Sequence, residues 1–240
     1  MNKTVLILGA NSDVAKQAIL QYLDKGFHVI AASRSTEQIS QFLSDHSVNL
    51  DNIEVLSFDA VDFQSHQTFY DGLSRKPNVV VYAAGYLVDN LQALQDWEGT
   101  YQMMNVHYAG AVSIINIIVS DKENKGLERI VGLSSLSGVR GRKSNFIYGS
   151  TKSAFTQYLA GMRQHLADRG VKVNVIVAGY IRSKMTDGLD LEESLMLEPS
   201  FIASSVVNVG NSFIIVPGFK WKLIYHILRV LPEFLVAKLP

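Results

Sequence analysis

A chain of 240 residues, of which 48% are hydrophobic and 18% charged, is long enough to bury one large core and too apolar to be disordered. Its 22 basic residues balance 22 acidic ones, so no bulk charge attracts a nucleic acid and we expect no nucleic-acid partner. Cysteine is absent, which excludes disulfides and thiolate chemistry, and the six histidines show no HExxH or comparable spacing, so we expect no metal site.

The N-terminus carries no pattern of a secretory signal. Lys3 is followed directly by the short apolar run of residues 5–8 and then by Gly9. That run is too short for the core of a signal peptide or for a membrane span. The expected location is therefore the cytoplasm.

Short apolar runs alternate with longer helical patterns along the chain. The predicted strands are residues 4–8, 29–32, 54–58, 79–82, 129–133, 171–177 and 213–216. Amphipathic stretches such as residues 14–25, 63–73 and 148–168 predict helices between the first six strands. Continuous apolar strands separated by helices predict an α/β fold, a Rossmann-like doubly wound sheet of seven parallel strands with its ligand crevice at their carboxyl ends.

Two segments are less regular. Residues 182–199 are polar and acidic, and we expect a mobile loop or a pair of helices over the site. The chain after Val216 holds three of the five prolines, so we divide the sequence into a domain of residues 1–216 and an appended helical tail of residues 217–240.

The turn after the first strand is suited to a nucleotide. A glycine there lets the backbone turn tightly beneath a pyrophosphate, whose charge the N-terminus of the next helix favours. The residues of this predicted turn are Gly9, Asn11, Ser12, Asp13 and Val14. Only the first glycine of a dinucleotide fingerprint is present, so an ordinary strand-to-helix turn at Gly9 is the alternative.

The second strand ends in Ser33 and Arg34, where sites that prefer NAD(H) place a carboxylate for the ribose 2′-hydroxyl. An arginine accommodates a 2′-phosphate instead. This pair favours NADP(H) over NAD(H). The alternative is that Arg34 is a solvated loop cation.

A group of side chains suited to acid–base chemistry lies in the second half of the chain. Tyr148 and Lys152 are four residues apart and share one face of a predicted helix, where the ammonium is expected to lower the pKa of the phenol. Ser135 lies thirteen residues before Tyr148, at the end of a predicted strand, and Asn105 lies further upstream. These four are the candidate catalytic residues.

Taken in order, these motifs resemble the short-chain dehydrogenase/reductase family over residues 3–185, and the four candidates fall on its catalytic tetrad. The resemblance adds cofactor contacts, which are Asp59, Ala60, Ala84, Gly85, Gly179, Ile181 and Ser183. Departures from the family pattern are Asp13 and Ala15 for two glycines, Tyr82 and Ala83 for two asparagines, Ala178 for a proline and Ser183 for a threonine. They indicate that the cofactor packs in a variant way. At positions 82 and 83, a support for the central strands is missing or substituted.

The resemblance implies an NAD(P)-dependent oxidoreductase, with NADPH-dependent reduction of a keto group as the leading expectation. Tyr148 would exchange the proton, Ser135 polarise the substrate oxygen, Lys152 tune the tyrosine and bind the ribose, and Asn105 hold a water. A dehydrogenase working in the oxidative direction, one half of an epimerising pair, and a non-catalytic nucleotide sensor are alternatives. The family also implies a homo-oligomer, either a dimer or a tetramer.

The tail predicts a helix over residues 221–231, ended by Pro232, with Lys222, His226 and Arg229 on one strip and apolar residues elsewhere. It could pack on its own domain, complete an oligomer interface, or lie in a membrane interface through residues 219–240. We favour the interfacial hypothesis. It makes a lipid-linked carbonyl, such as a lipid-linked sugar or a keto-lipid, an attractive substrate beside an ordinary small molecule.

Overall fold

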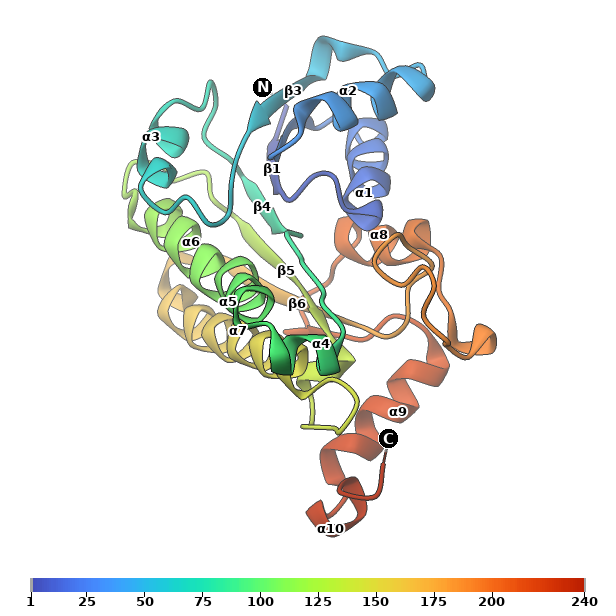
Figure 1. Cartoon of the computed structure of the whole chain (residues 1–240). Helices are drawn as coiled ribbons and strands as arrows, with labels where there is room; N and C mark the ends of the chain where they lie inside the picture. Colours follow the sequence, from blue (N-terminus) through green and yellow to red (C-terminus); the bar gives the residue numbers. More distant parts are fainter. Residues whose placement is uncertain (1, 240) are drawn as a thin grey trace.

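A computed structural model describes residues 2–239, and the seven predicted strands form one parallel sheet in it (Figure 1). The strand order is β3-β2-β1-β4-β5-β6-β7, which confirms the doubly wound Rossmann-like prediction. The bounds agree within a few residues, except that the last strand has only two. The strands are β1 (Thr4–Leu8), β2 (His28–Ser33), β3 (Ile53–Ser57), β4 (Val79–Tyr82), β5 (Arg129–Ser135), β6 (Lys172–Ala178) and β7 (Ile214–Ile215).

Helices cover both faces of the sheet because successive side chains of each buried strand point to opposite sides. In β1, Val5 and Ile7 belong to one core, and Leu6 and Leu8 to the other. The first core is covered by α1 (Asp13–Asp24), α2 (Thr36–Asp45) and α8 (Pro199–Val207). The second is covered by α3 (Ser65–Asp71), α6 (Gly110–Ser120) and α7 (Phe146–His165), with α4 (Asn90–Gln95) and α5 (Trp97–Met104) leading into α6.

The chain from Trp97 to Ser120 is one continuous helical stretch that the sequence reading did not single out. A five-residue π-helical turn, η2 (Asn105–Ala109), joins α5 to α6. The stretch is long and apolar enough to cross a membrane, with a mean hydropathy of 1.4, but half of its most apolar window is buried in the domain. It serves as a core helix beside α7.

The C-terminal tail forms α9 (Phe219–Val230) and α10 (Glu233–Val236), and α9 ends before Pro232, as predicted. Trp221, Tyr225 and Leu228 of α9 are buried in the same core as α6 and α7. The rest of α9 projects from the body of the molecule, and α10 forms its far end (Figure 1). The tail is therefore anchored along one side and not buried as a whole.

Candidate active site

A cavity of about 510 Å³ opens at the carboxyl ends of the central strands. The predicted site residues that line it are Gly9, Asn11, Ser12, Asp13, Val14, Ser33, Arg34, Asp59, Ala60, Ala84, Gly85, Tyr148, Lys152, Ile181 and Ser183. Asn105, Ser135 and Gly179 lie outside this lining. Further lining residues, which no motif in the sequence indicates, are Phe58, Ala83, Tyr86, Leu87, Val106, Leu133, Ser134, Lys184 and Met185.

Gly9 makes the tight turn between β1 and α1 that the cavity requires. Its φ is +86°, a left-handed conformation that favours glycine, and a Cβ there would overlap the backbone N of Ala84. Three residues on, the Ser12 hydroxyl accepts the Ala15 N–H at 3.1 Å and caps α1. The positive end of α1 is thereby directed at the cavity floor.

The end of β2 is tied to this turn through Asn11. Its Nδ2 donates to Ser33 Oγ at 2.8 Å and to the Ser35 carbonyl at 2.7 Å, while its Oδ1 is buried without a partner among the described residues. Arg34 beside them is exposed at the cavity, and within residues 2–239 it forms no ion pair. Arg34 is thus placed to receive an anionic group.

Asp13 joins the nucleotide turn to a distant loop. Its Oδ2 accepts the backbone N–H of Lys184 at 2.8 Å, and both residues line the cavity. The Asp13 carboxylate, which stands where the family has a glycine, therefore accepts a hydrogen bond from the loop. This bond places Lys184 beside Asp13 in the cavity wall. No sequence spacing pointed to Lys184, because its partner lies 171 residues away.

The turn after β3 supplies the opposite wall. Asp59 Oδ1 accepts the Val61 N–H at 3.1 Å, which fixes this turn, and Ala60 follows it into the cavity lining. A Cβ at Gly110 would overlap the Ala60 carbonyl, so the start of α6 can lie directly against this segment.

Tyr148 lies in the first turn of α7 and Lys152 one turn later, as their spacing predicted. A Cβ at Gly149 would meet the Ser137 carbonyl at 2.5 Å, and one at Gly138 would meet the Ser153 N at 2.8 Å. These two glycines let the turn after β5 pack directly on α7. That packing places Ser135, the last residue of β5, where its side chain lowers the pKa of the Tyr148 phenol against the effect of burial.

The pKa of the Tyr148 phenol is shifted in the direction opposite to the one expected from the sequence. Burial raises the pKa of its phenol to about 12, opposed by the hydrogen bond from Ser135, so the predicted lowering by Lys152 is wrong for this arrangement. The reason is where the lysine points: Lys152 Nζ donates to the Leu133 carbonyl at 3.2 Å and lies 5.7 Å from the Tyr148 ring centroid. Burial also lowers the pKa of Lys152 itself to about 8.

Asn105 is the first residue of the π-helical turn, and its carbonyl accepts the Gly110 N–H, five residues on. Such turns often occur at functional sites. The side chain does not line the cavity, whereas its neighbour Val106 does. Asn105 therefore stands behind the site, at its supporting helix.

The support that the missing asparagines would give is substituted. The Tyr82 hydroxyl donates to the Val106 carbonyl at 2.5 Å, which ties β4 to the π-helical turn. His107, fully buried in that turn, accepts the Tyr86 N–H on Nε2 at 3.0 Å. The substitutions at positions 82 and 83 are visible in the sequence, whereas the contacts that replace the asparagines form only in the tertiary structure.

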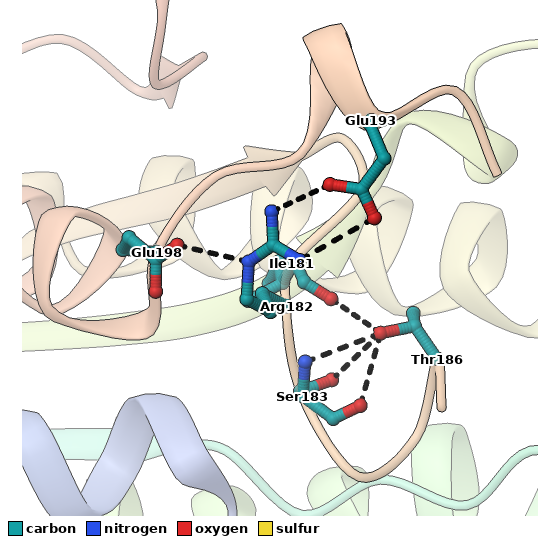
Figure 2. A network of polar contacts seen from close by, with 6 residues as sticks. All are labelled: Ile181, Arg182, Ser183, Thr186, Glu193 and Glu198. Atoms are coloured by element: carbon teal, nitrogen blue, oxygen red, sulfur yellow. Dashed lines mark hydrogen bonds and ion pairs between the residues drawn. The ribbon is translucent and has the colours of Figure 1, made fainter. Parts of the chain in front are cut away.

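Residues 182–196 form a loop tethered at its base by a bridge between Ile181 and Leu197. Figure 2 shows the side-chain contacts that hold this loop. Arg182 donates to Glu193 at 2.7 Å and to Glu198 at 3.0 Å. The Ser183 N–H donates to Thr186 Oγ1 at 3.2 Å. The described loop contains one short 3-10 turn, η5 (Glu193–Leu195), so the alternative of a helix pair is wrong.

The tail reaches the base of this loop. The Trp221 ring lies on Gly179 so closely that a Cβ at Gly179 would overlap it, and Trp221 Nε1 donates to the Leu195 carbonyl at 2.8 Å. Gly179 thus receives the tail and does not line the cavity.

Comparisons with known proteins agree with this geometry. Residues 3–194 match the profile of the short chain dehydrogenase family. An uncharacterised oxidoreductase of Mycobacterium tuberculosis is 24% identical over 245 residues, covering 98% of this chain and 96% of its own. One from Streptomyces coelicolor is 24% identical over 243 residues, covering 99% and 96%.

Solved structures share the fold. A short chain dehydrogenase of Burkholderia cenocepacia in complex with NADP superposes with a TM-score of 0.83 at 16% identity, covering 98% of this chain and 95% of that one. ElxO with NADP bound gives 0.80 at 23% identity, covering 93% and 100%. From the family match and these relatives, the chain belongs to the short-chain dehydrogenase family and is an NAD(P)-dependent oxidoreductase that acts on CH–OH groups.

Proposed function

We propose that the enzyme reduces a keto group to an alcohol with NADPH. One observation supports this proposal above the others. The protonated phenol of Tyr148 lies close to Ser135 and Lys152, and Tyr148 and Lys152 line the same cavity as Gly9 and Arg34. A phenol with a pKa of about 12 is protonated at neutral pH, which is the form that a reduction consumes.

The cavity residues fit a dinucleotide. Its volume of about 510 Å³ lies within the range of about 300–1,000 Å³ common for ligand sites. The N-terminus of α1 after the tight turn at Gly9 suits a pyrophosphate, and Asn11 Oδ1, which has no partner among the described residues, suits a ribose hydroxyl. Arg34, exposed at the end of β2, favours NADP(H) over NAD(H).

A nicotinamide cofactor held by the Gly9 turn and Arg34 would supply the hydride for the carbonyl carbon. Tyr148 donates its proton to the carbonyl oxygen, so that the C=O group gains one hydride and one proton and becomes an alcohol. The Ser135 hydroxyl donates to the same oxygen and orients it. Lys152, with a pKa of about 8, is able to return a proton toward Tyr148, and Asn105 would hold a water that resupplies this proton.

The proposal extends to the setting of the enzyme. Residues 1–216 form the NADP(H)-binding domain and residues 217–240 the tail. The substrate is a small carbonyl compound or one linked to a lipid, taken up in the cytoplasm at the inner face of the membrane. An exposed apolar stripe supports a homodimer or tetramer: Leu94, Trp97, Tyr101, Met104 and Tyr108.

The first test is a titration of the purified chain with NADPH and NADH, followed by nicotinamide fluorescence. We expect tighter binding of NADPH, and a loss of about 1–3 kcal/mol of that binding in Arg34→Ala with NADH affinity unchanged. Arg75→Ala, an exposed arginine away from the cavity, is the matched control. Equal binding of both nucleotides by the wild type would contradict the preference.

A second test separates a catalyst from a nucleotide sensor. Tyr148→Phe removes the proton donor, and we expect turnover of a keto substrate to fall about 10²- to 10⁴-fold while NADPH still binds. Tyr158→Phe on the same helix, whose hydroxyl donates to Asn116, should leave turnover unchanged. Full activity in Tyr148→Phe would remove this tyrosine from the mechanism.

A further inference from the structure

Helix α9 has two apolar faces, of which the domain covers one. Trp221, Tyr225 and Leu228 are buried against the core. At 100° per residue, a second apolar stripe lies opposite them. Its members and exposed fractions are Phe219 (83%), Leu223 (55%), Ile227 (46%) and Val230 (80%). Phe234 of α10 is 67% exposed, so the apolar surface continues past Pro232.

Basic side chains border this stripe. Lys222, His226 and Arg229 lie along one edge and are exposed, and Lys220 on the other edge donates to the Ser194 carbonyl at 3.0 Å. Residues 217–240 hold four lysines and arginines against one glutamate, a net charge of +3. Because the whole chain is neutral, residues 1–216 carry −3. The positive charge is thus concentrated where the exposed apolar stripe is.

Contacts with the domain fix helix α9 at both of its ends. Arg140 Nε donates to the Leu228 carbonyl at 3.0 Å and its Nη2 donates to the Leu231 carbonyl at 3.0 Å, which satisfies carbonyls at the end of α9. At the other end, Trp221 is fixed on Gly179. The projecting position of α9 in Figure 1 is therefore part of the fold, and a flat surface can reach the outer stripe.

We infer that the outward face of α9 and α10 binds a membrane surface rich in anionic lipid. The stripe enters the boundary between headgroups and acyl chains, and the bordering cations contact the anionic headgroups. A second copy of the chain fits this face less well, because pairing it with itself brings two tails of net charge +3 together. The net negative charge of the rest of the chain turns the body away from the same surface.

Membrane binding by α9 and α10 would bring the active site to a lipid-linked substrate, and this role rests on the proposed function. Arg140 lies on the segment that follows Ser135, and Trp221 holds the loop that carries Ser183. The docked tail therefore brings both loops beside the cavity close to the bilayer. A carbonyl group on a lipid anchor would reach Tyr148 from that side.

The test is co-sedimentation of the full chain with vesicles. We expect the protein to pellet with vesicles of mixed phosphatidylglycerol and phosphatidylcholine and to stay in solution with pure phosphatidylcholine. The double variant Leu223→Ser and Ile227→Ser should bind about tenfold more weakly, since it removes two outer side chains and no core contact. Lys222→Gln with Arg229→Gln should lose about tenfold as well, and more at low salt.

Leu50→Ser is the matched control, because Leu50 is 64% exposed and lies directly before β3, which is far from α9 and α10 in Figure 1. Unchanged pelleting of the Leu223 and Ile227 variant, or equal binding to both kinds of vesicle, overturns the inference. So does a drop in oligomeric mass in that variant without a loss of pelleting. Pelleting needs no turnover, so a chain that binds vesicles but no NADPH contradicts only the proposed function, and the reverse result contradicts only the docking surface.

Discussion

The Nδ1 atom of buried His107 lies 2.7 Å from the Thr151 hydroxyl, and this bond joins the π-helical turn to the helix that carries Tyr148. His107 Nε2 accepts the Tyr86 N–H, so Nδ1 carries the proton and donates it to Thr151. The Thr151 hydroxyl in turn donates to the Tyr148 carbonyl at 2.7 Å. One neutral imidazole therefore fixes the wall of the cavity and the backbone of the proton donor together.

Replacing this imidazole should cost both stability and activity. In His107→Phe the Tyr86 N–H loses its partner, and we expect the free energy of unfolding in urea to fall by about 1–3 kcal/mol. Turnover should fall more than NADPH affinity, because Tyr148 loses its support. His165→Phe, at an exposed histidine of α7, should change stability by less than about 0.5 kcal/mol.

The same residue makes stability depend on pH. Burial holds the pKa of His107 well below its ordinary value, whereas the unfolded chain takes up a proton below a pH of about 6.5. The unfolded state then binds more protons, so the stability of the wild type should fall as the pH drops below about 6.5. His107→Phe should lack this part of the slope, and urea unfolding between mildly acid and neutral pH measures it. Parallel curves for the two proteins would contradict a neutral buried His107.

Lys152 should lower the free energy of unfolding at neutral pH although turnover requires it. Its pKa is lowered to about 8 by burial, while the unfolded side chain titrates near a pH of about 10.4, so the charged form is disfavoured in the folded state. Lys152→Met should abolish turnover yet raise the free energy of unfolding at neutral pH by about 1–3 kcal/mol. The wild type should regain this difference as the pH rises from about 8 to about 10.4. A less stable Lys152→Met at neutral pH would show that the bond to the Leu133 carbonyl outweighs the cost of burial.

A methyl group at Gly179 should displace the tail. It would overlap the Trp221 ring, and overpacking of this kind costs about 1–3 kcal/mol. Gly161→Ala in α7, where a Cβ meets nothing within 4 Å, should instead stabilise by about 0.5–1 kcal/mol. Urea unfolding compares the two, and the fluorescence of Trp221 should change only in Gly179→Ala. An unchanged Trp221 signal would mean that the tail does not rest on Gly179.

The local pattern of apolar and polar residues in the sequence predicted much of the fold and part of the site. Continuous apolar strands and the helical period of the segments between them predict a parallel sheet, because both depend on near neighbours in the chain. Gly9 and Ser33 were predictable for the same reason: the carboxyl ends of parallel strands share one edge of the sheet. The Tyr148 and Lys152 pair followed from a spacing of four residues on a helix.

Contacts between distant segments were decided only by the tertiary structure. No pattern pairs Asp13 with Lys184, or Arg140 with the end of α9, because hydrogen bonds across 88 or 171 residues leave no period in the sequence. The sign of the Tyr148 pKa shift also depended on packing, since burial and the direction of the Lys152 side chain outweigh the spacing of the two residues. The sequence by itself determined which groups could do chemistry, and tertiary packing decided which of them meet, which are buried, and which face of the tail stays exposed.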